Sequence, residues 1–254
     1  MLLIVVAAAA GAHSQNAPPL VEGGEWREAA EEIFARVNQA RAQQGLEKLE
    51  WDASLAAAAL EHCRRMAAEG EIEHRYTGEP ALAERTASAG ARFNLVEENI
   101  GTGPTAARLH EEWMNSPGHR ANLLNPRVNR VGIVVVLARG TLYAVEDFSR
   151  AVEKLNPEEL EERVSSQLRA AGVVVLADRE QARSACAMEK GVPTGVGSDQ
   201  PLFVARWQSG SLDRLPDVLV AALQSKQYRR AAVGSCAAKD VAMFSAFRLA
   251  VLLY

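Results

Sequence analysis

Apolar residues in the first part of the chain recur at the spacing of one helix face. The positions at i, i+3, i+4, i+7, i+8 and i+11 are Trp26, Ala29, Ala30, Ile33, Phe34 and Val37. Gly45 is placed to end this predicted helix. A second helix is predicted from its N-cap residue Asp52 to Gly70, and two more at residues 80–90 and 105–116.

The fourth helix is expected to end at Pro117-Gly118, and strand-like sequence follows only after this turn. The apolar runs "RVGIVVVL" at 130–137 and "TLYAVEDF" at 141–148 are separated by "ARG", which predicts an antiparallel hairpin. Helices that come first, with strands late and in hairpins, predict an α/β sandwich of the α+β class.

A domain boundary is predicted near residue 150. Residues 151–163, "AVEKLNPEELEER", are acidic and contain Pro157, which indicates a linker that runs into a helix. Residues 164–254 contain four strand-like runs and the helix-like "LPDVLVAALQSK", which predicts a smaller α/β unit. Its helix–strand–strand order resembles the end of the first domain, so we expect a degenerate half repeat. The alternative is that a helix followed by a hairpin is simply a common arrangement.

Composition narrows the class of protein. The 254 residues are 48% hydrophobic and 24% charged, with a net charge of −4, which is typical of a globular protein and argues against nucleic acid as a partner. Residues 1–14 form an apolar run that ends in small residues and predict a signal peptide, hence a secreted, periplasmic or cell-envelope protein. No Lys or Arg precedes Arg27, so a buried first element is the alternative. No internal run reaches the ~20 apolar residues of a membrane span, so no transmembrane anchor is expected after signal removal.

The chain has three cysteines. Cys186 and Cys236 lie in the C-terminal third, and in an exported protein we expect them to form a disulfide. Cys63 lies within an Ala-rich predicted helix and is interpreted as a small buried apolar group. Three free thiols are the alternative.

Two histidines stand out as candidate site residues. His62 lies on an apolar helix face and His110 in a charged one, so both are interpreted as structural. His74 and His119 are expected in loops just after helix ends, with the segment "LVEENIGTG" between them. Two imidazoles and the Glu98 carboxylate could bind a divalent cation, Zn²⁺ or Mg²⁺. Their wide spacing is no local metal motif, so a hydrogen-bonded structural cluster is the alternative.

The order of segments resembles the bacterial branch of the CAP superfamily, the SCP-like extracellular domain, over residues 26–150. The resemblance rests on "ARVNQARAQQGLEKLEWDASLAAAALEHCRRMA", "EHRYTG", "EENIGTG", "LHEEWMNSPGHRANLLNPRVNRVGIVVV" and "LYAVEDF". It implies an α-β-α sandwich with a central antiparallel sheet and a cleft lined by His74, Glu98 and His119. Glu97 replaces the family's glycine, and Ser116 stands where many members have a second acid. At most three protein ligands would then hold a metal.

The resemblance implies a non-catalytic binding module for an extracellular lipid, peptide or envelope component. One alternative is a metal-dependent hydrolase or protease in the same cleft, with Glu98 as general base, or a serine mechanism through Ser116. No "GxSxG" or "HExxH" motif supports catalysis. Another is a structural or adhesive protein acting through its C-terminal unit. Structural roles are expected for Trp113, which would bury its helix against the sheet, and for Asn99 and Asn122.

Overall fold

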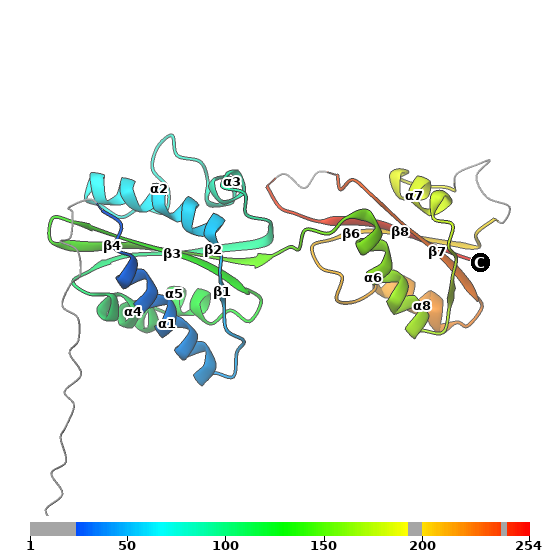
Figure 1. The fold of residues 1–254 in the computed structure, drawn as a ribbon, viewed down its shortest axis with the longest axis horizontal. Coiled ribbons are helices and arrows are strands. Elements are labelled where there is room, and N and C mark those ends of the chain that lie inside the picture. Colours follow the sequence, from blue (N-terminus) through cyan, green and yellow to red (C-terminus); the bar gives the residue numbers. More distant parts are fainter. Residues whose placement is uncertain (1–23, 193–199, 240–242) are drawn as a thin grey trace, which may run out of the picture.

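The structure is a computed structural model that describes residues 24–192, 200–239 and 243–254. The predicted signal peptide, residues 1–14, lies outside the described residues. Two units follow one another along the chain, and each has a four-stranded sheet with helices on both faces (Figure 1). The predicted α+β class and the α-β-α sandwich are confirmed.

The first unit begins with a helix and ends with a long hairpin. Its elements are α1 (Arg27–Gln43), β1 (Glu50–Trp51), α2 (Ala53–Glu69), α3 (Leu82–Ser88), β2 (Phe93–Gly103), α4 (Ala106–Asn115), α5 (Pro117–Leu123), β3 (Arg130–Ala138) and β4 (Thr141–Ala151). The strand order is β1-β3-β4-β2, with β1 parallel to β3 and the other pairs antiparallel. The predicted hairpin is therefore the β3–β4 pair, and β2 is an edge strand.

The helices of the first unit cover opposite faces of this sheet. Helices α2 and α3 lie on one face, and α1, α4 and α5 lie on the other (Figure 1). A core cluster on the α1 face includes Ile33, Val37 and Trp113, and a second cluster under α2 includes Cys63 and Met66. The apolar stripes read from the sequence thus bury against the sheet from both sides.

Local sequence sets where α2 begins, ends and packs. The Asp52 carboxylate accepts hydrogen bonds from the backbone N–H groups of Ser54 and Leu55, and Gly70 ends the helix with a φ of 85°. A Cβ added to Gly132 of β3 would lie 2.1 Å from the backbone nitrogen of Ala56. Only glycine at this position lets α2 approach the sheet so closely.

Two segments near the predicted site differ from expectation. Pro117 does not lead into a loop but begins α5, because proline suits the first turn of a helix. Ser116 alone separates α4 from α5, so His119 lies in a helix and not in a loop. The polar segment "EENIGTG" is part of strand β2, whose position at the sheet edge tolerates polar side chains.

The second unit repeats the order of the first. Its elements are α6 (Pro157–Ala170), β5 (Val174–Val175), α7 (Glu180–Ala187), β6 (Phe203–Ser209), α8 (Asp217–Gln224), β7 (Arg230–Cys236) and β8 (Phe247–Leu253). The strand order β5-β7-β8-β6 matches β1-β3-β4-β2, and β5 is again parallel to its neighbour. Helix α7 lies on one face, and α6 and α8 on the other (Figure 1).

The correspondence includes details of the backbone. After α1 the chain turns at Gly45 and the N–H of Leu46 donates to the carbonyl of Arg41 at 3.0 Å. After α6 it turns at Gly172 and the N–H of Val173 donates to the carbonyl of Leu168 at 3.1 Å. A Cβ added to Gly234 of β7 would lie 2.1 Å from the backbone nitrogen of Arg183 in α7. Gly234 therefore allows α7 to approach its sheet as closely as Gly132 allows α2. The similarity therefore extends to α6, β5 and α7, beyond the half that the sequence suggested.

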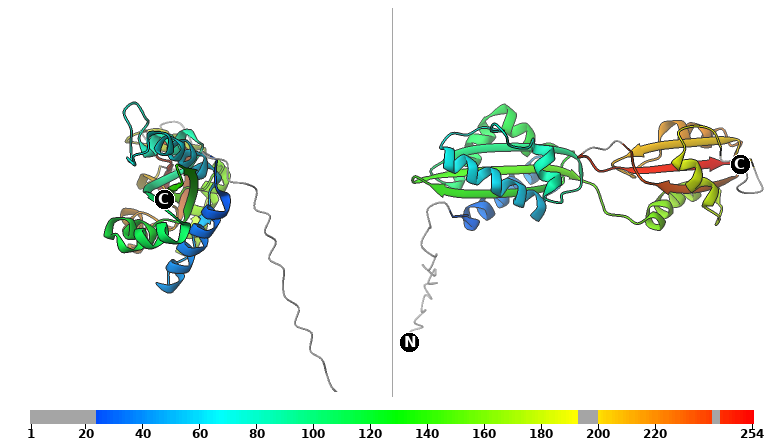
Figure 2. Two further views of the ribbon diagram at one scale, coloured as in Figure 1. Left: turned by 90° about the vertical axis from the view of Figure 1, so that its left-hand side faces the viewer. Right: turned by 90° about the horizontal axis from the view of Figure 1, so that it is seen from above.

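The predicted disulfide between Cys186 and Cys236 is confirmed, and it joins α7 to the end of β7. Cys63 is free and buried, its Sγ lies 3.2 Å from the carbonyl oxygen of Tyr143, and burial raises its pKa to about 12. The two sheets lie end to end (Figure 2). The segment before β8 contacts the first unit, where the Ser245 N–H donates to the carbonyl of Phe93 at 2.7 Å.

Candidate functional site

Glu98 of the edge strand β2 is the centre of a buried polar cluster. Its Oε1 lies 2.8 Å from Nδ1 of His74, and its Oε2 forms an ion pair with the guanidinium of Arg85. Because an ionised carboxylate only accepts hydrogen bonds, Nδ1 of His74 donates, and Nε2 of the neutral ring is left as an acceptor. Both oxygens of Glu98 are therefore engaged.

His74 and Arg85 reach Glu98 from the α2–α3 side of the sheet. His74 lies between α2 and α3, and its side chain is 60% exposed. Arg85 lies on α3, is 8% exposed, and also donates from Nη1 to the carbonyl of His74 at 3.5 Å. One arginine thus orders both the carboxylate and the backbone beside it.

His62 of α2 anchors the loop on which His74 lies. Its Nδ1 is 2.6 Å from Oε1 of Glu79, and the other oxygen of Glu79 accepts from the N–H of Tyr76 at 3.0 Å. Nε2 of His62 lies 3.9 Å from Oε2 of Glu98. The histidine interpreted as structural from the sequence therefore also borders the candidate site.

Helix α5 places His119 on the other side of β2. The side-chain amide of Asn99 donates to the carbonyl of His119 at 3.2 Å, and that of Asn122 donates to the carbonyl of Glu98 at 3.1 Å. Burial lowers the pKa of His119, and the nearby charge of His74 lowers it further.

Two of the predicted cleft residues lie away from this cluster. Side chains alternate along a strand, so Glu97 points to the face opposite Glu98, where Asn125 donates to its Oε1 at 2.7 Å. Ser116 forms the corner between α4 and α5, and no side-chain cap bond is made there. Among the described residues, its hydroxyl makes no hydrogen bond to either site histidine. Trp113 is buried, and its Nε1 donates to the carbonyl of Ile100 at 3.0 Å.

The site histidines are biased toward the neutral form. Burial lowers the pKa of His74, and the positive charge of Arg85 lowers it further. The same two causes, in the same order, outweigh the hydrogen bond of His62 to Glu79 and lower its pKa. A lowered pKa favours the uncharged imidazole, which offers one donor and one acceptor nitrogen.

Two acidic residues under the site were missed in the sequence. Glu146 and Asp147 of β4 are 0% exposed, and burial raises their pKa values to about 8 and about 7. Asp147 pairs with Glu98 across the strands, while Glu146 accepts from the amide of Asn99 at 3.1 Å. The sequence does carry a signal for Glu146 and Asp147, because two adjacent acids are unusual inside an otherwise apolar run such as "TLYAVEDF". Arg85 has no such signal in the sequence.

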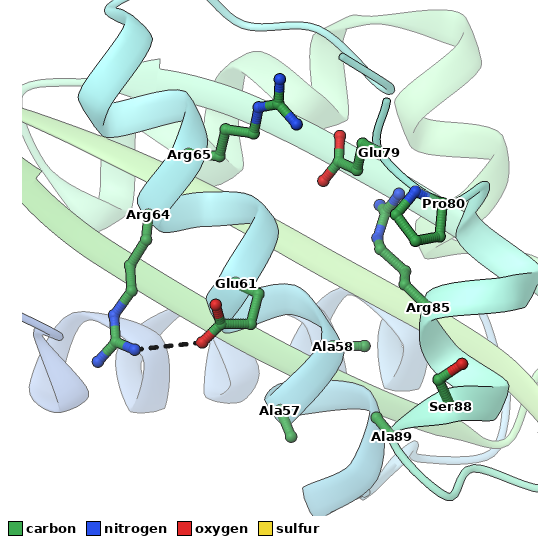
Figure 3. Close-up of a pocket in the computed structure, with 10 residues that line it drawn as sticks. All are labelled: Ala57, Ala58, Glu61, Arg64, Arg65, Glu79, Pro80, Arg85, Ser88 and Ala89. Carbon is green, nitrogen blue, oxygen red and sulfur yellow. Dashed lines mark hydrogen bonds and ion pairs between the residues drawn. The ribbon is translucent and has the colours of Figure 1, made fainter. Parts of the chain in front are cut away.

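A groove of about 680 Å³ opens beside the cluster, between α2 and α3. Its lining residues are Ala57, Ala58, Glu61, Arg64, Arg65, Glu79, Pro80, Arg85, Ser88 and Ala89 (Figure 3). Arg85 reaches from α3 to the side of Glu79. The same arginine therefore borders the groove and contacts Glu98.

The residues present do not fit a metal ion. Across residues 24–192, 200–239 and 243–254, no group of three or more His, Cys, Asp or Glu side chains is placed to hold one. The reason lies at Glu98, where Arg85 and His74 occupy the two oxygens. The metal set of His74, Glu98 and His119 expected from the sequence is not such a group among the described residues, and it stays a prediction.

The first unit is an α-β-α sandwich with a histidine–carboxylate cluster at its edge strand, as the resemblance implies for an SCP-like domain. Residues 34–148, less than half of the chain, match the family model described as the Cysteine-rich secretory protein family, CAP. The second unit lies beyond the matched residues.

Similar proteins cover parts of the chain. Uncharacterized membrane protein YlbC of Bacillus subtilis is 31% identical over 126 residues, which are 46% of this chain and 36% of that protein. Uncharacterized protein YkwD of Bacillus subtilis is 29% identical over 102 residues, 40% of each chain. The match thus spans less than half of either relative. An outer surface protein from Borrelia burgdorferi superposes with a TM-score of 0.48 at 22% identity, covering 51% of this chain and 98% of that one. None of the described helices is long and apolar enough to cross a bilayer.

Proposed function

We propose that this protein is a secreted or cell-envelope CAP domain protein whose cleft binds a ligand without catalysing a reaction. The observation that supports this most is the engagement of Glu98, whose two carboxylate oxygens are held by His74 and Arg85. A general base needs an oxygen within hydrogen-bond reach of the proton it removes. Both oxygens of Glu98 already have partners and the residue is buried, which supports a role in orienting His74 over a role as general base.

A serine hydrolase mechanism has less support. A nucleophilic hydroxyl needs a base within hydrogen-bond reach and a third group to orient that base. Ser116 forms no hydrogen bond to His119 in the described part of the chain, and its backbone is committed to the corner between α4 and α5. Ser116 is therefore assigned to the turn.

The ligand that best suits this cleft has uncharged hydrogen-bonding groups. Arg85 neutralises Glu98, and the lowered pKa values of His74 and His119 keep both rings neutral. Each ring then presents polar nitrogens without net charge, which suits the backbone amides of an extended peptide or the hydroxyl and amide groups of an envelope component.

The chemistry of the second unit supports export. The Cys186–Cys236 disulfide persists in oxidising compartments, such as the periplasm or the extracellular space. The apolar segment at residues 1–14 is consistent with a secretory signal. We also propose that α6 and the residues after it form a reduced CAP-like repeat, which contains no histidine and therefore no counterpart of His74.

The test is binding of a neutral peptide array to the full chain, measured for the wild type, His74→Ala and His119→Ala. His110→Ala is the matched control, because His110 lies on α4 outside the cluster. We expect both site variants to lose binding at least about tenfold, which corresponds to about 1.4 kcal/mol, and the control to bind like the wild type. The same preparations are assayed for peptide and ester hydrolysis. Turnover by the wild type that both site variants lose would overturn the non-catalytic proposal.

A further inference from the structure

We propose that Arg85 is the built-in cation of this CAP cleft: its guanidinium takes the position beside Glu98 that a divalent ion would take, and makes the site independent of metal. This inference goes beyond the proposed function and does not depend on which ligand binds. It assigns to Arg85 a positioning role, since it acts through Glu98 and His74.

The first support is the geometry of the ion pair. Arg85 is 8% exposed, and its Nη2 contacts Oε2 of Glu98, while Oε1 is held by His74. A guanidinium stays protonated at every physiological pH. Glu98 therefore has a permanent positive partner on the oxygen that would otherwise be free to coordinate a metal.

The second support is the number of buried acids around the guanidinium. Asp147 pairs with Glu98 across β2 and β4, so both side chains lie on the Arg85 face of the sheet. The charge of Arg85 acts on Asp147 as well, opposing the burial that raises its pKa. Two carboxyl groups that would attract a cation thus share one arginine.

The third support is the cost of adding a metal to this arrangement. A divalent ion bound to Glu98 would lie within a few ångströms of the guanidinium, and like charges in a partly buried site repel strongly. His74 already donates from Nδ1 to Glu98, so this ring could offer a metal only Nε2, and Glu98 would then support the ring rather than bind the metal itself. The wild-type cluster therefore disfavours Zn²⁺ even though it contains residue types that zinc prefers.

The inference is tested by titrating Zn²⁺ into the full chain at pH 7.5 by calorimetry. Arg85→Met removes the charge while keeping an unbranched side chain of similar length. We expect Arg85→Met to bind Zn²⁺ at least about tenfold more tightly than the wild type. The double variant Arg85→Met/Glu98→Gln should lose this gain, because the gain depends on the freed carboxylate.

Two further measurements keep the test decisive if Arg85→Met folds poorly. Arg85→Lys retains a positive charge, and we expect it to bind Zn²⁺ as weakly as the wild type. Dialysis of the wild type against EDTA should leave its thermal midpoint unchanged. The proposal is overturned if the wild type binds one equivalent of Zn²⁺ that His74→Ala or Glu98→Gln abolishes. A loss of thermal stability on dialysis, or equal affinities of folded Arg85→Met and wild type, would overturn it too.

Discussion

The two units of this chain have the same strand order and the same helix layers, yet they differ in how completely their buried charged groups are hydrogen-bonded. In the second unit, Glu161 of α6 is 0% exposed and every acceptor is used. Its oxygens accept from Arg183 at 2.7 and 2.8 Å, from Arg179 at 3.0 Å, and from the backbone N–H of Ser235 at 2.9 Å. This cluster ties α6 and α7 to β7 and leaves nothing for a ligand.

In the first unit the buried charges are incompletely satisfied. Nε of Arg85, Nε2 of His62 and both carboxylate oxygens of Asp147 are buried without a hydrogen-bond partner within the described residues. Buried polar groups normally find partners, and exceptions concentrate where a protein has a function. The shared architecture is therefore a scaffold, and the candidate site depends on side chains that only one copy has.

The second unit lacks these additions because its connections are shorter. Helix α2 has 17 residues and is followed by a loop and α3, which position His74 and Arg85. Its counterpart α7 has 8 residues, and no helix lies between α7 and β6 in the described part of the chain. In the described part of the second unit, no helix corresponds to α3, and α3 is the element from which Arg85 reaches the edge strand of the first unit.

The largest effect that would separate the units is loss of the disulfide. Replacing Cys186 and Cys236 by Ser frees a chain segment with a sequence separation of 50. We expect the free energy of unfolding of the second unit to fall by about 4 kcal/mol, because the unfolded chain gains conformational entropy. Hydrogen exchange of β7 and β8 peptides measures it. Cys63→Ala, which leaves the disulfide intact, is the control, and equal exchange in both variants would contradict the prediction.

A somewhat smaller effect tests whether the two units pack alike. Gly132→Ala and Gly234→Ala would each place a Cβ 2.1 Å from a backbone nitrogen of the helix above. We expect each to destabilise its own unit by about 3 kcal/mol, because the helix must move away from the sheet. Gly118→Ala is the matched control, since a Cβ there meets nothing within 4 Å. Exchange rates in the two sheets report the effects separately, and a tolerated Gly234→Ala would break the equivalence.

The spacing of apolar residues predicted most helices and strands of the first unit, and the elements that it did not predict have physical explanations. Helix α2 was bounded correctly because Asp52 and Gly70 act locally, and the β3–β4 hairpin because both strands are apolar. Strand β2 was missed because it lies at a sheet edge, where polar side chains are tolerated and no continuous apolar run is needed. The helix containing His119 was missed because Pro117 reads equally as a helix end and a helix start.

The candidate site was predicted only in part. The resemblance identified His74, Glu98 and His119, because the motifs keep their order along the chain. It could not identify Arg85, because an arginine on a short helix looks like any surface arginine until α3 packs beside β2. The side to which Glu97 points also depends on strand register, which no single strand specifies alone.

The smallest expected effect is a difference in how the units respond to pH. Burial raises the pKa of Glu146 to about 8 and of Asp147 to about 7, so the folded first unit keeps protons that the unfolded chain has released. Its free energy of unfolding should therefore fall as pH rises from about 6.5 to about 8, by about 1.4 kcal/mol per pH unit for each group still protonated. Histidines, whose pKa values are lowered by burial, are neutral in both states across most of this window.

The free energy of unfolding of the second unit should not change over the same pH range. Burial opposes ionisation of Glu161, but hydrogen bonds from Arg183, Ser235 and Arg179 outweigh it and hold its pKa below the usual value. The stability that ionised Glu161 contributes is therefore fully present above the pKa of the unfolded chain and is lost only in acid. Residues 151–254 also contain no histidine that could titrate near neutral pH. Hydrogen exchange of peptides from β3–β4 and from β7–β8, corrected for the pH dependence of the intrinsic rates, measures the stability of both units in one sample. Glu146→Gln/Asp147→Asn should abolish the slope in the first unit, and a slope that persists in this variant would assign the pH dependence to other groups.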